Sequence, residues 1–285
     1  MSLQSSVSSR AALAAPLRAG GQPRFNAPRL LSMLGLLLAA VFLLLPVLVI
    51  VPLSFGDQRY LAFPEGAWSL RHYAALLDTA WLSSILQSLG LAVVGGALST
   101  VLAFLFATGI WLEPRHRVLL TSIVLLPMIV PQVVSAMSIY YLGARVQMLD
   151  SLIGVGFGHL MMALPYSLIA MLVAYSRLDT NLYKASRSLG AGLGSSLVLV
   201  LMPNVRGGLA GSFFMAFIMS WEEVVVTLFT SGLHVITLPK RIWDGLRYNL
   251  DPAIAAVSTL MVLITLIVLL GRMYWHHRNA APPGR

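Results

Sequence analysis

The sequence lacks cysteine and is poor in charged residues. With no cysteine among its 285 residues, disulfides, thiolate nucleophiles, iron–sulfur ligation and cysteine zinc sites are all excluded. Charged residues make up only 10% of the chain, against about 25% in a typical soluble domain, and this shortage argues against a soluble fold. Negatively charged residues are scarcer than positively charged ones, with 10 Asp and Glu against 19 Lys and Arg, so the excess of positive charge needs an explanation.

Long apolar runs take the place of the missing charge. Hydrophobic residues form 58% of the chain, and runs long enough for a transmembrane helix, which needs about 20 apolar residues, recur along it. We therefore predict an all-α polytopic membrane protein with six transmembrane helices. The predicted spans cover residues 30–55, 82–111, 118–143, 152–176, 207–231 and 253–274.

The basic residues indicate the orientation of these spans. If the N-terminus lies inside, most Lys and Arg residues fall in the cytoplasmic tail, the second loop, residues 177–206 and the C-terminal end. Such a bias is the positive-inside pattern of membrane proteins, so we predict that both termini are cytoplasmic. It also explains the positive charge without a nucleic-acid partner.

The first 29 residues form a separate segment. They contain four arginines, no acid and many Ser, Ala and Gly residues, a composition typical of a disordered tail. An organellar transit peptide has the same composition and stays open as an alternative.

Prolines and small residues inside the spans indicate helix bends and close packing. Pro127 and Pro131 are predicted to kink the third span, either for packing or for contact with a solute. Small residues spaced four apart allow helix backbones to approach closely. They are Ala92, Gly96 and Thr100, Gly154 and Gly158, and Gly207 and Gly211.

Two acids lie near the middle of the fifth predicted span, in SWEEVVVTLF. Carboxylates at that depth cost about 2.5 to 3.5 kcal/mol each, so they normally face a cavity or a partner. Neighbouring helix residues point about 100° apart, so at most one of Glu222 and Glu223 can face a central path, and the other should pair with a polar group on the next helix. Three roles stay open: buried contacts to another subunit, a path for a cation beside Trp221, and a proton relay with His159.

The basic segment YKASRSLGAGLGSSLVLVLMP lies inside the cell on this topology. Asp179 or Asn181 can cap a short helix that Gly190 ends, and a second amphipathic piece ends at Pro203. The first helix has a narrow face of apolar or small residues, namely Leu182, Ala185, Ser186 and Leu189.

This segment resembles the cytoplasmic signature of the type I permeases of ATP-binding-cassette importers. That signature reads Glu-Ala-Ala, three residues, Gly, nine residues, then Ile-x-Leu-Pro. Here Lys184, Ala185 and Ser186 precede Gly190 at the same spacing, and residues 200–203 read VLMP. The departures are Lys184 for Glu and Ser186 for Ala, with milder changes at residues 200 and 202.

The chain beyond the tail is most similar to the spermidine/putrescine-type permeases. The segments LLPMIVPQVVSAMS, SWEEVVVTLFTSG and TLPKRIWDGLRYNLDPAIAAVST carry this resemblance. The subgroup often has an acid after the second proline, where this chain has Gln132. The resemblance implies a MetI-like fold in a bacterial inner membrane, with a first helix and external loop at 30–81, a permease core at 82–276 and a C-terminal tail at 277–285.

The resemblance also implies partners and roles. We expect a second permease, two ATPase subunits that bind ATP and Mg²⁺, and an external solute-binding protein. This chain itself would bind no cofactor or metal, have no catalytic residue, and carry a small, cationic solute such as a polyamine. Residues 182–203 would couple it to the ATPases, and the solute path would include Gln132, Trp221, Glu222 and Glu223. The alternative is a stand-alone ion-coupled carrier or channel that uses Glu222 and Glu223.

Overall fold

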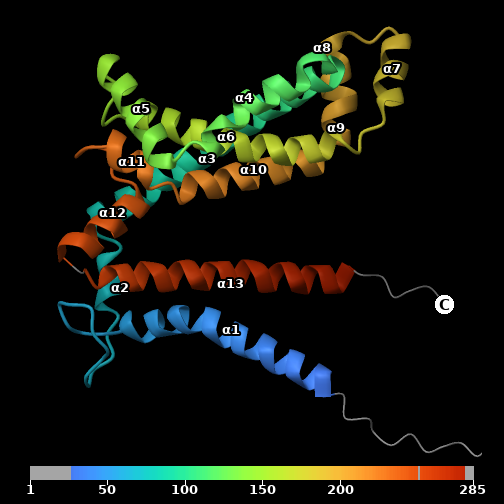
Figure 1. Ribbon diagram of the computed structural model, residues 1–285. Helices are drawn as coiled ribbons and strands as arrows, with labels where there is room; N and C mark the ends of the chain where they lie inside the picture. Colours follow the sequence, from blue (N-terminus) through green and yellow to red (C-terminus); the bar gives the residue numbers. More distant parts are fainter. Residues whose placement is uncertain (1–26, 250, 280–285) are drawn as a thin grey trace, which may run out of the picture. The chain divides into compact units, whose positions relative to one another are not determined.

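The computed structural model describes residues 27–249 and 251–279, and over those ranges it consists of helices and loops without a β-strand (Figure 1). It confirms the all-α prediction for that part of the chain. The predicted tail at 1–29 and the C-terminal tail at 277–285 lie outside the described residues, apart from residues 27–29 and 277–279.

Four helices are long and apolar enough to cross a membrane, and two bent pairs of shorter helices raise the number of spans to as many as six. The four are α1 (Ala27–Leu53), α3 (Thr79–Leu112), α6 (Leu152–Tyr175) and α13 (Ala253–Asn279). One bent pair joins the helix at Pro114–Ile129 to α5 (Gln132–Arg145) at 99°, and the other joins Leu193–Asn204 to α10 (Arg206–Trp221) at 78°.

The chain divides into two compact units, Met1–Leu48 and Val49–Arg285. The described part of the first unit is most of α1, which has no charged residue after Arg29. All packing described below lies within the second unit.

Shorter elements connect the spans. Before α3 lies α2 (Arg71–Ala75), and η1 (Pro114–His116) leads into α4 (Arg117–Ile129). After α6 come α7 (Thr180–Ser188), α8 (Leu193–Ser195), η2 (Ser196–Leu201) and α9 (Met202–Asn204). After α10 come α11 (Val225–Thr230), α12 (Leu238–Asp244) and η3 (Gly245–Asn249).

The centre of the second unit is the packing of α3, α6 and α10, which run alongside one another (Figure 1). Small residues permit this contact. Gly96 has no side chain, and a Cβ atom added to it would lie only 3.3 Å from the backbone nitrogen of Phe217 on α10, closer than an ordinary contact. At Gly208 an added Cβ would overlap the Cβ of Ala174. The predicted pair Gly207 and Gly211 has nothing within 4 Å of an added Cβ, so Gly208 makes the close approach in their place.

Two spans predicted as single helices are broken, which corrects their predicted bounds. The third predicted span ends as α4 at Ile129 and restarts as α5 at Gln132. Pro131 explains this break, because a proline forces the preceding residue out of the helical region, and Val130 has ψ 134°. Pro127 stays inside α4, so only the second proline marks the break. The fifth predicted span ends as α10 at Trp221 and continues as α11 from Val225.

The predicted cytoplasmic helix is present as α7, at the end of the three-helix packing opposite to α5 and α11 (Figure 1). The side chain of Asp179 accepts a hydrogen bond from the Asn181 N–H at 2.9 Å and caps the helix, as predicted. Gly190 follows its end with φ +84°, a conformation that favours glycine, so the predicted stop is also confirmed.

Candidate functional site

A cavity of about 470 Å³ lies where the break between α4 and α5 meets the break between α10 and α11. Its wall is formed by the end of α4 and the start of α5, by the break between α10 and α11, and by α6. The lining residues are Pro127–Gln132, Met162, Tyr166, Met219 and Glu222–Val225. Two of them are carboxylic acids and none is basic.

One of the two acids is a structural connection between the breaks. Glu223 is 4% exposed; its Oε2 accepts a hydrogen bond from Gln132 Nε2 at 2.6 Å, and its Oε1 accepts one from the Val226 N–H at 2.8 Å. The second bond satisfies a free donor in the first turn of α11, as an N-cap does. The expectation that one acid pairs with a polar group on another helix is met by Glu223 and Gln132.

The other acid is exposed in the cavity. Glu222 directly follows α10 as its C-cap residue, is exposed, and lines the cavity. Its carboxylate forms no hydrogen bond or ion pair with the residues that the structure describes. The two neighbouring acids therefore have different environments, although the sequence gives no sign of which is which.

Trp221 is not among the residues that line the cavity. Its ring stacks on Phe217, with centroids 6.1 Å apart and planes at 13°, and packs against the apolar cluster around Trp81 and Leu238. Its role in the solute path stays a prediction. Tyr166, which the sequence did not single out, is the aromatic residue that lines the cavity.

A histidine on α6 supports the break between α10 and α11. His159 is 1% exposed; its Nδ1 lies 2.9 Å from Ser220 Oγ, on α10, and its Nε2 lies 2.9 Å from Thr227 Oγ1, on α11. The Thr227 hydroxyl donates to the carbonyl of Glu223 at 3.1 Å, so it accepts a hydrogen bond from the Nε2–H of the ring. The ring contacts neither carboxylate, so the geometry favours hydrogen-bonded packing over a proton relay.

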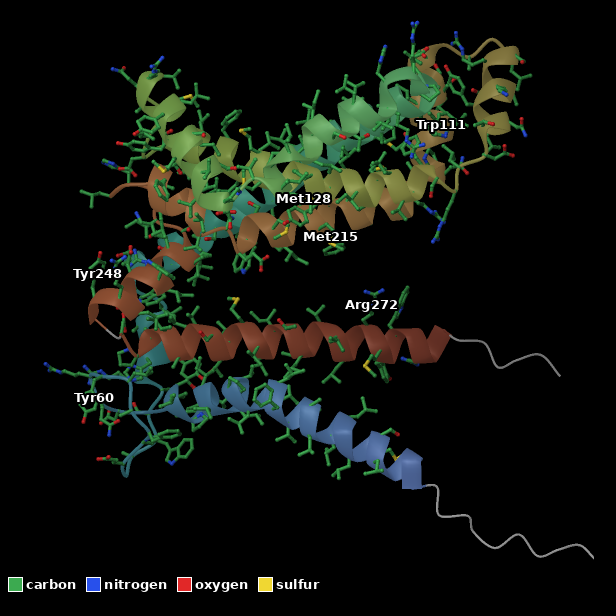
Figure 2. The ribbon with its side chains drawn as sticks, viewed as in Figure 1. Tyr60, Trp111, Met128, Met215, Tyr248 and Arg272 are labelled. Atoms are coloured by element: carbon green, nitrogen blue, oxygen red, sulfur yellow. The ribbon has the colours of Figure 1, made fainter. Side chains whose placement is uncertain are left out.

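The coupling residues predicted between residues 182 and 203 do not share one surface. Ser186 is 8% exposed and donates to Ser196 Oγ of η2 at 2.9 Å, so it faces its own chain. The others are exposed, Leu189 at 88%, together with Leu182, Lys184, Ala185, Gly190 and Pro203. The Tyr183 ring packs edge-on against Trp111, and this contact connects α7 to the central helices. Trp111 lies at the end of α3 and is labelled in Figure 2.

No group of three or more His, Asp or Glu residues suited to a metal occurs within 27–249 and 251–279.

Comparison with known proteins identifies the family. The model of the binding-protein-dependent transport system inner membrane component matches residues 99–279, more than half of the chain. The chain belongs to this family. It is therefore a permease component of an ATP-binding-cassette importer, a multi-pass protein of the inner membrane, and the relatives are transport subunits rather than enzymes.

Several relatives match most of the chain at modest identity. The spermidine/putrescine permease PotC of Haemophilus influenzae is 23% identical over 241 residues, 84% of this chain and 93% of that protein. The putrescine permease PotI of Escherichia coli is 24% identical over 250 residues, 85% and 88% of the two chains. A probable molybdenum transporter permease of Haloferax volcanii is 28% identical over 260 residues, 85% and 91%.

A solved structure shows the same fold. A chain of a bacterial transporter that imports the acidic polysaccharide alginate superposes with a TM-score of 0.64 at 15% identity, over 88% of this chain and 98% of that one. The MetI-like importer permease fold expected from the sequence is thereby confirmed.

Proposed function

We propose that this chain is one of two permease subunits that together enclose the path of a small cationic solute, of the polyamine class. The observation that carries the proposal is the exposed carboxylate of Glu222 in a cavity without a basic side chain. A carboxylate and an aromatic ring are the groups that hold an amine, and the ring available there belongs to Tyr166.

The relatives support a cation over an anion only in combination with the cavity. Two of them are named for polyamines and one for molybdenum, and all are of similar identity. An oxyanion would need positive groups or converging donors, whereas the cavity presents two acids. Gln132 stands where many polyamine-type permeases have an acid, and its amide is engaged by Glu223, so Glu222 is the principal cation ligand in this proposal.

Coupling to ATP hydrolysis would occur through residues 182–203. The exposed side chains of Leu182 and Leu189 offer an apolar contact to an ATPase subunit, and Tyr183 packs on Trp111 of α3. ATP and Mg²⁺ would bind the two ATPase partners and not this chain. Both termini and α7 would lie in the cytoplasm, and a solute-binding protein would deliver cargo on the other side.

The decisive experiment reconstitutes the complete transporter in proteoliposomes, with this chain, its second permease, the ATPase subunits and the binding protein. We expect ATP-dependent uptake of radiolabelled putrescine or spermidine, lost in Glu222→Gln while the complex still assembles. Uptake of molybdate in preference to polyamines would overturn the cationic cargo. Uptake by the chain alone, driven by an ion gradient, would indicate the carrier alternative.

A further inference from the structure

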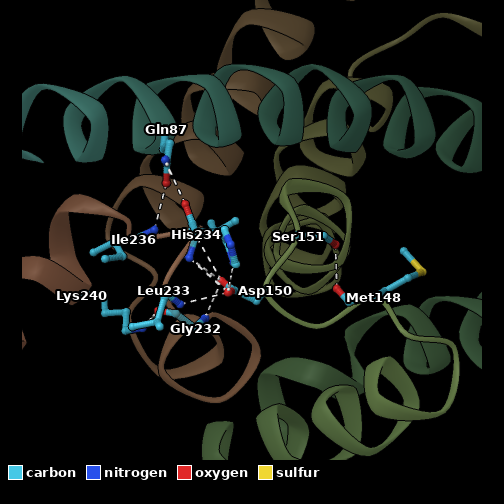
Figure 3. A network of polar contacts seen from close by, with 10 residues as sticks. Gln87, Met148, Asp150, Ser151, Gly232, Leu233, His234, Ile236 and Lys240 are labelled. Atoms are coloured by element: carbon cyan, nitrogen blue, oxygen red, sulfur yellow. Dashed lines mark hydrogen bonds and ion pairs between the residues drawn. The ribbon is translucent and has the colours of Figure 1, made fainter. Parts of the chain in front are cut away.

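A single carboxylate holds the loop between α11 and α12 (Figure 3). Asp150 lies in the link from α5 to α6, and the backbone N–H groups of four consecutive residues, 232–235, point at it. Gly232 and Val235 donate to Oδ1 at 2.7 and 3.0 Å, and Leu233 donates to Oδ2 at 2.9 Å. The His234 N–H reaches both oxygens at 3.1 Å, and its Nδ1 lies 2.7 Å from Oδ2.

Successive N–H groups that converge in this way form an anion-binding nest. Here the nest is filled by the chain's own side chain, 82 to 85 residues away in sequence. The fit is close, because a Cβ atom on Gly232 would lie 2.7 Å from Asp150 Oδ2. The Asp150 N–H also donates to the carbonyl of Thr230, the last residue of α11, at 2.8 Å.

The same loop is attached to α3 on its other side. Gln87 Oε1 accepts from the Ile236 N–H at 2.9 Å, and Ser88 Oγ accepts from the Leu238 N–H at 2.7 Å. Lys240 Nζ donates to the carbonyl of Gly232 at 3.0 Å (Figure 3). The loop is therefore held between the start of α6 and the first half of α3.

The Asp150 contact also completes a pair of connections between α5 and α11. At the cavity end these helices are joined by Gln132 and Glu223, and between them Ala136, Ile139 and Val226 form one buried cluster. At the opposite end Asp150 joins the link after α5 to the end of α11 and the following loop. A shift of the loop would therefore be transmitted to α11, the helix that begins just after the two acids of the cavity.

We propose that Asp150 is a positioning residue, which fills the nest of residues 232–235 and holds this loop in the shape that the solute-binding protein meets. The loop follows α11, at the end of the central helices opposite to the proposed cytoplasmic helix α7 (Figure 1). The proposal rests on the proposed function as far as the binding protein is concerned. The attachment of the loop by Asp150 can be tested independently of the proposed function.

The first experiment measures hydrogen–deuterium exchange in the purified full chain in lipid nanodiscs. Asp150→Gly removes the carboxylate yet tolerates the residue's φ of +53°, and it leaves room for a formate ion. We expect amide exchange at 232–235 to become faster by about tenfold or more, as for the loss of charge-assisted hydrogen bonds, and to slow again with sodium formate but not with sodium chloride. If amide exchange at 232–235 in Asp150→Gly equals that of the wild type, or if formate and chloride change it equally, the proposed attachment is wrong.

Asp150→Asn provides a second variant that keeps the size of the side chain and also tolerates positive φ. Its amide nitrogen cannot accept hydrogen bonds, so exchange at 232–235 should again accelerate. The matched control is Asp57→Asn, an exposed acid in the loop before α2, which should leave this peptide unchanged. An equal response in both variants would show a general charge effect and contradict the proposal.

The second experiment uses the reconstituted transporter and the loaded binding protein. Asp150→Asn should raise the concentration of binding protein that half-maximally stimulates ATP hydrolysis by several-fold, and it should leave the unstimulated rate unchanged. In Asp150→Gly, formate should bring that concentration back toward the wild-type value. A fall in the maximal rate alone would overturn the positioning role. If the wild type shows no binding-protein stimulation, the proposed function fails while the exchange experiment still decides the attachment.

Discussion

Gln132 and Glu223 join the breaks of two different spans through a hydrogen bond of 2.6 Å. Each break leaves backbone groups without helical partners inside a predicted membrane span, where such groups are tolerated only beside a cavity or other protein. The bond between the two side chains holds the free ends around one cavity of about 470 Å³. The two breaks together therefore create the cavity in which Glu222 remains exposed.

Glu223 and Glu222 should respond differently to truncation. Glu223→Ala leaves the Val226 N–H and the Gln132 amide without their partner, at about 1–3 kcal/mol for each group, and should lower the Tm of the purified chain. Glu222→Ala, at an exposed position, should stay within about 0.5 kcal/mol of the wild type. Thermal unfolding in detergent measures both, and equal losses would contradict the division between the two acids.

Gly208 should be intolerant of any side chain. Gly208→Ala places a Cβ against Ala174 and must push α10 away from α6, an overpacking that costs about 1–3 kcal/mol. The control is Gly211→Ala on the same helix, where nothing lies within 4 Å of the added atom. Thermal unfolding of the two variants should separate them, and a Tm for Gly208→Ala equal to that of the control would refute the close contact.

Gly190 should be required for coupling rather than for assembly. Its φ of +84° costs an L-residue about 1–2 kcal/mol, so Gly190→Val should displace the end of α7. In the reconstituted transporter we expect ATP hydrolysis to continue while uptake falls. Gly192→Ala is the control, because Gly192 has φ −65° and open space around it. Full uptake in Gly190→Val would contradict the docking role.

The Asp150 contact should persist in mild acid. Burial raises the pKa of Asp150, but hydrogen bonds from the Val235 and His234 N–H groups, the His234 ring and the Gly232 N–H outweigh it, and the pKa lies well below its usual value. A lowered pKa contributes stability above the unfolded value, about 3.9, and that contribution is lost as the pH falls further through the folded value. The Tm difference between wild type and Asp150→Asn should therefore persist at about pH 5 and shrink below about pH 4. A difference that already disappears near pH 6 would contradict this assignment.

Much of this arrangement follows from local sequence. Uncharged apolar runs determine the helices, because a membrane span must satisfy its own backbone. Asp179 and Gly190 determine the ends of α7, because capping and a positive φ are properties of single residues. The spacing from Lys184 to Pro203 indicated the family that the match over residues 99–279 establishes.

Other features depend on contacts between distant residues. The sequence places Glu222 and Glu223 side by side, but only the position of Gln132 decides that Glu223 is paired and Glu222 is exposed. Likewise Ser186 shares a helix face with Leu182 in the sequence pattern, and the approach of Ser196 turns it inward. Asp150 has no distinguishing neighbour in sequence, since its partners are more than 80 residues away.

The sequence by itself determined which segments are helical, where several of them end, and which transporter family they form. The tertiary structure decided which acid is exposed in the cavity and which carboxylate holds the loop between α11 and α12. The physical reason is that helix formation and capping are satisfied within a few residues, whereas a buried or half-buried carboxylate takes its role from donors that only folding brings to it.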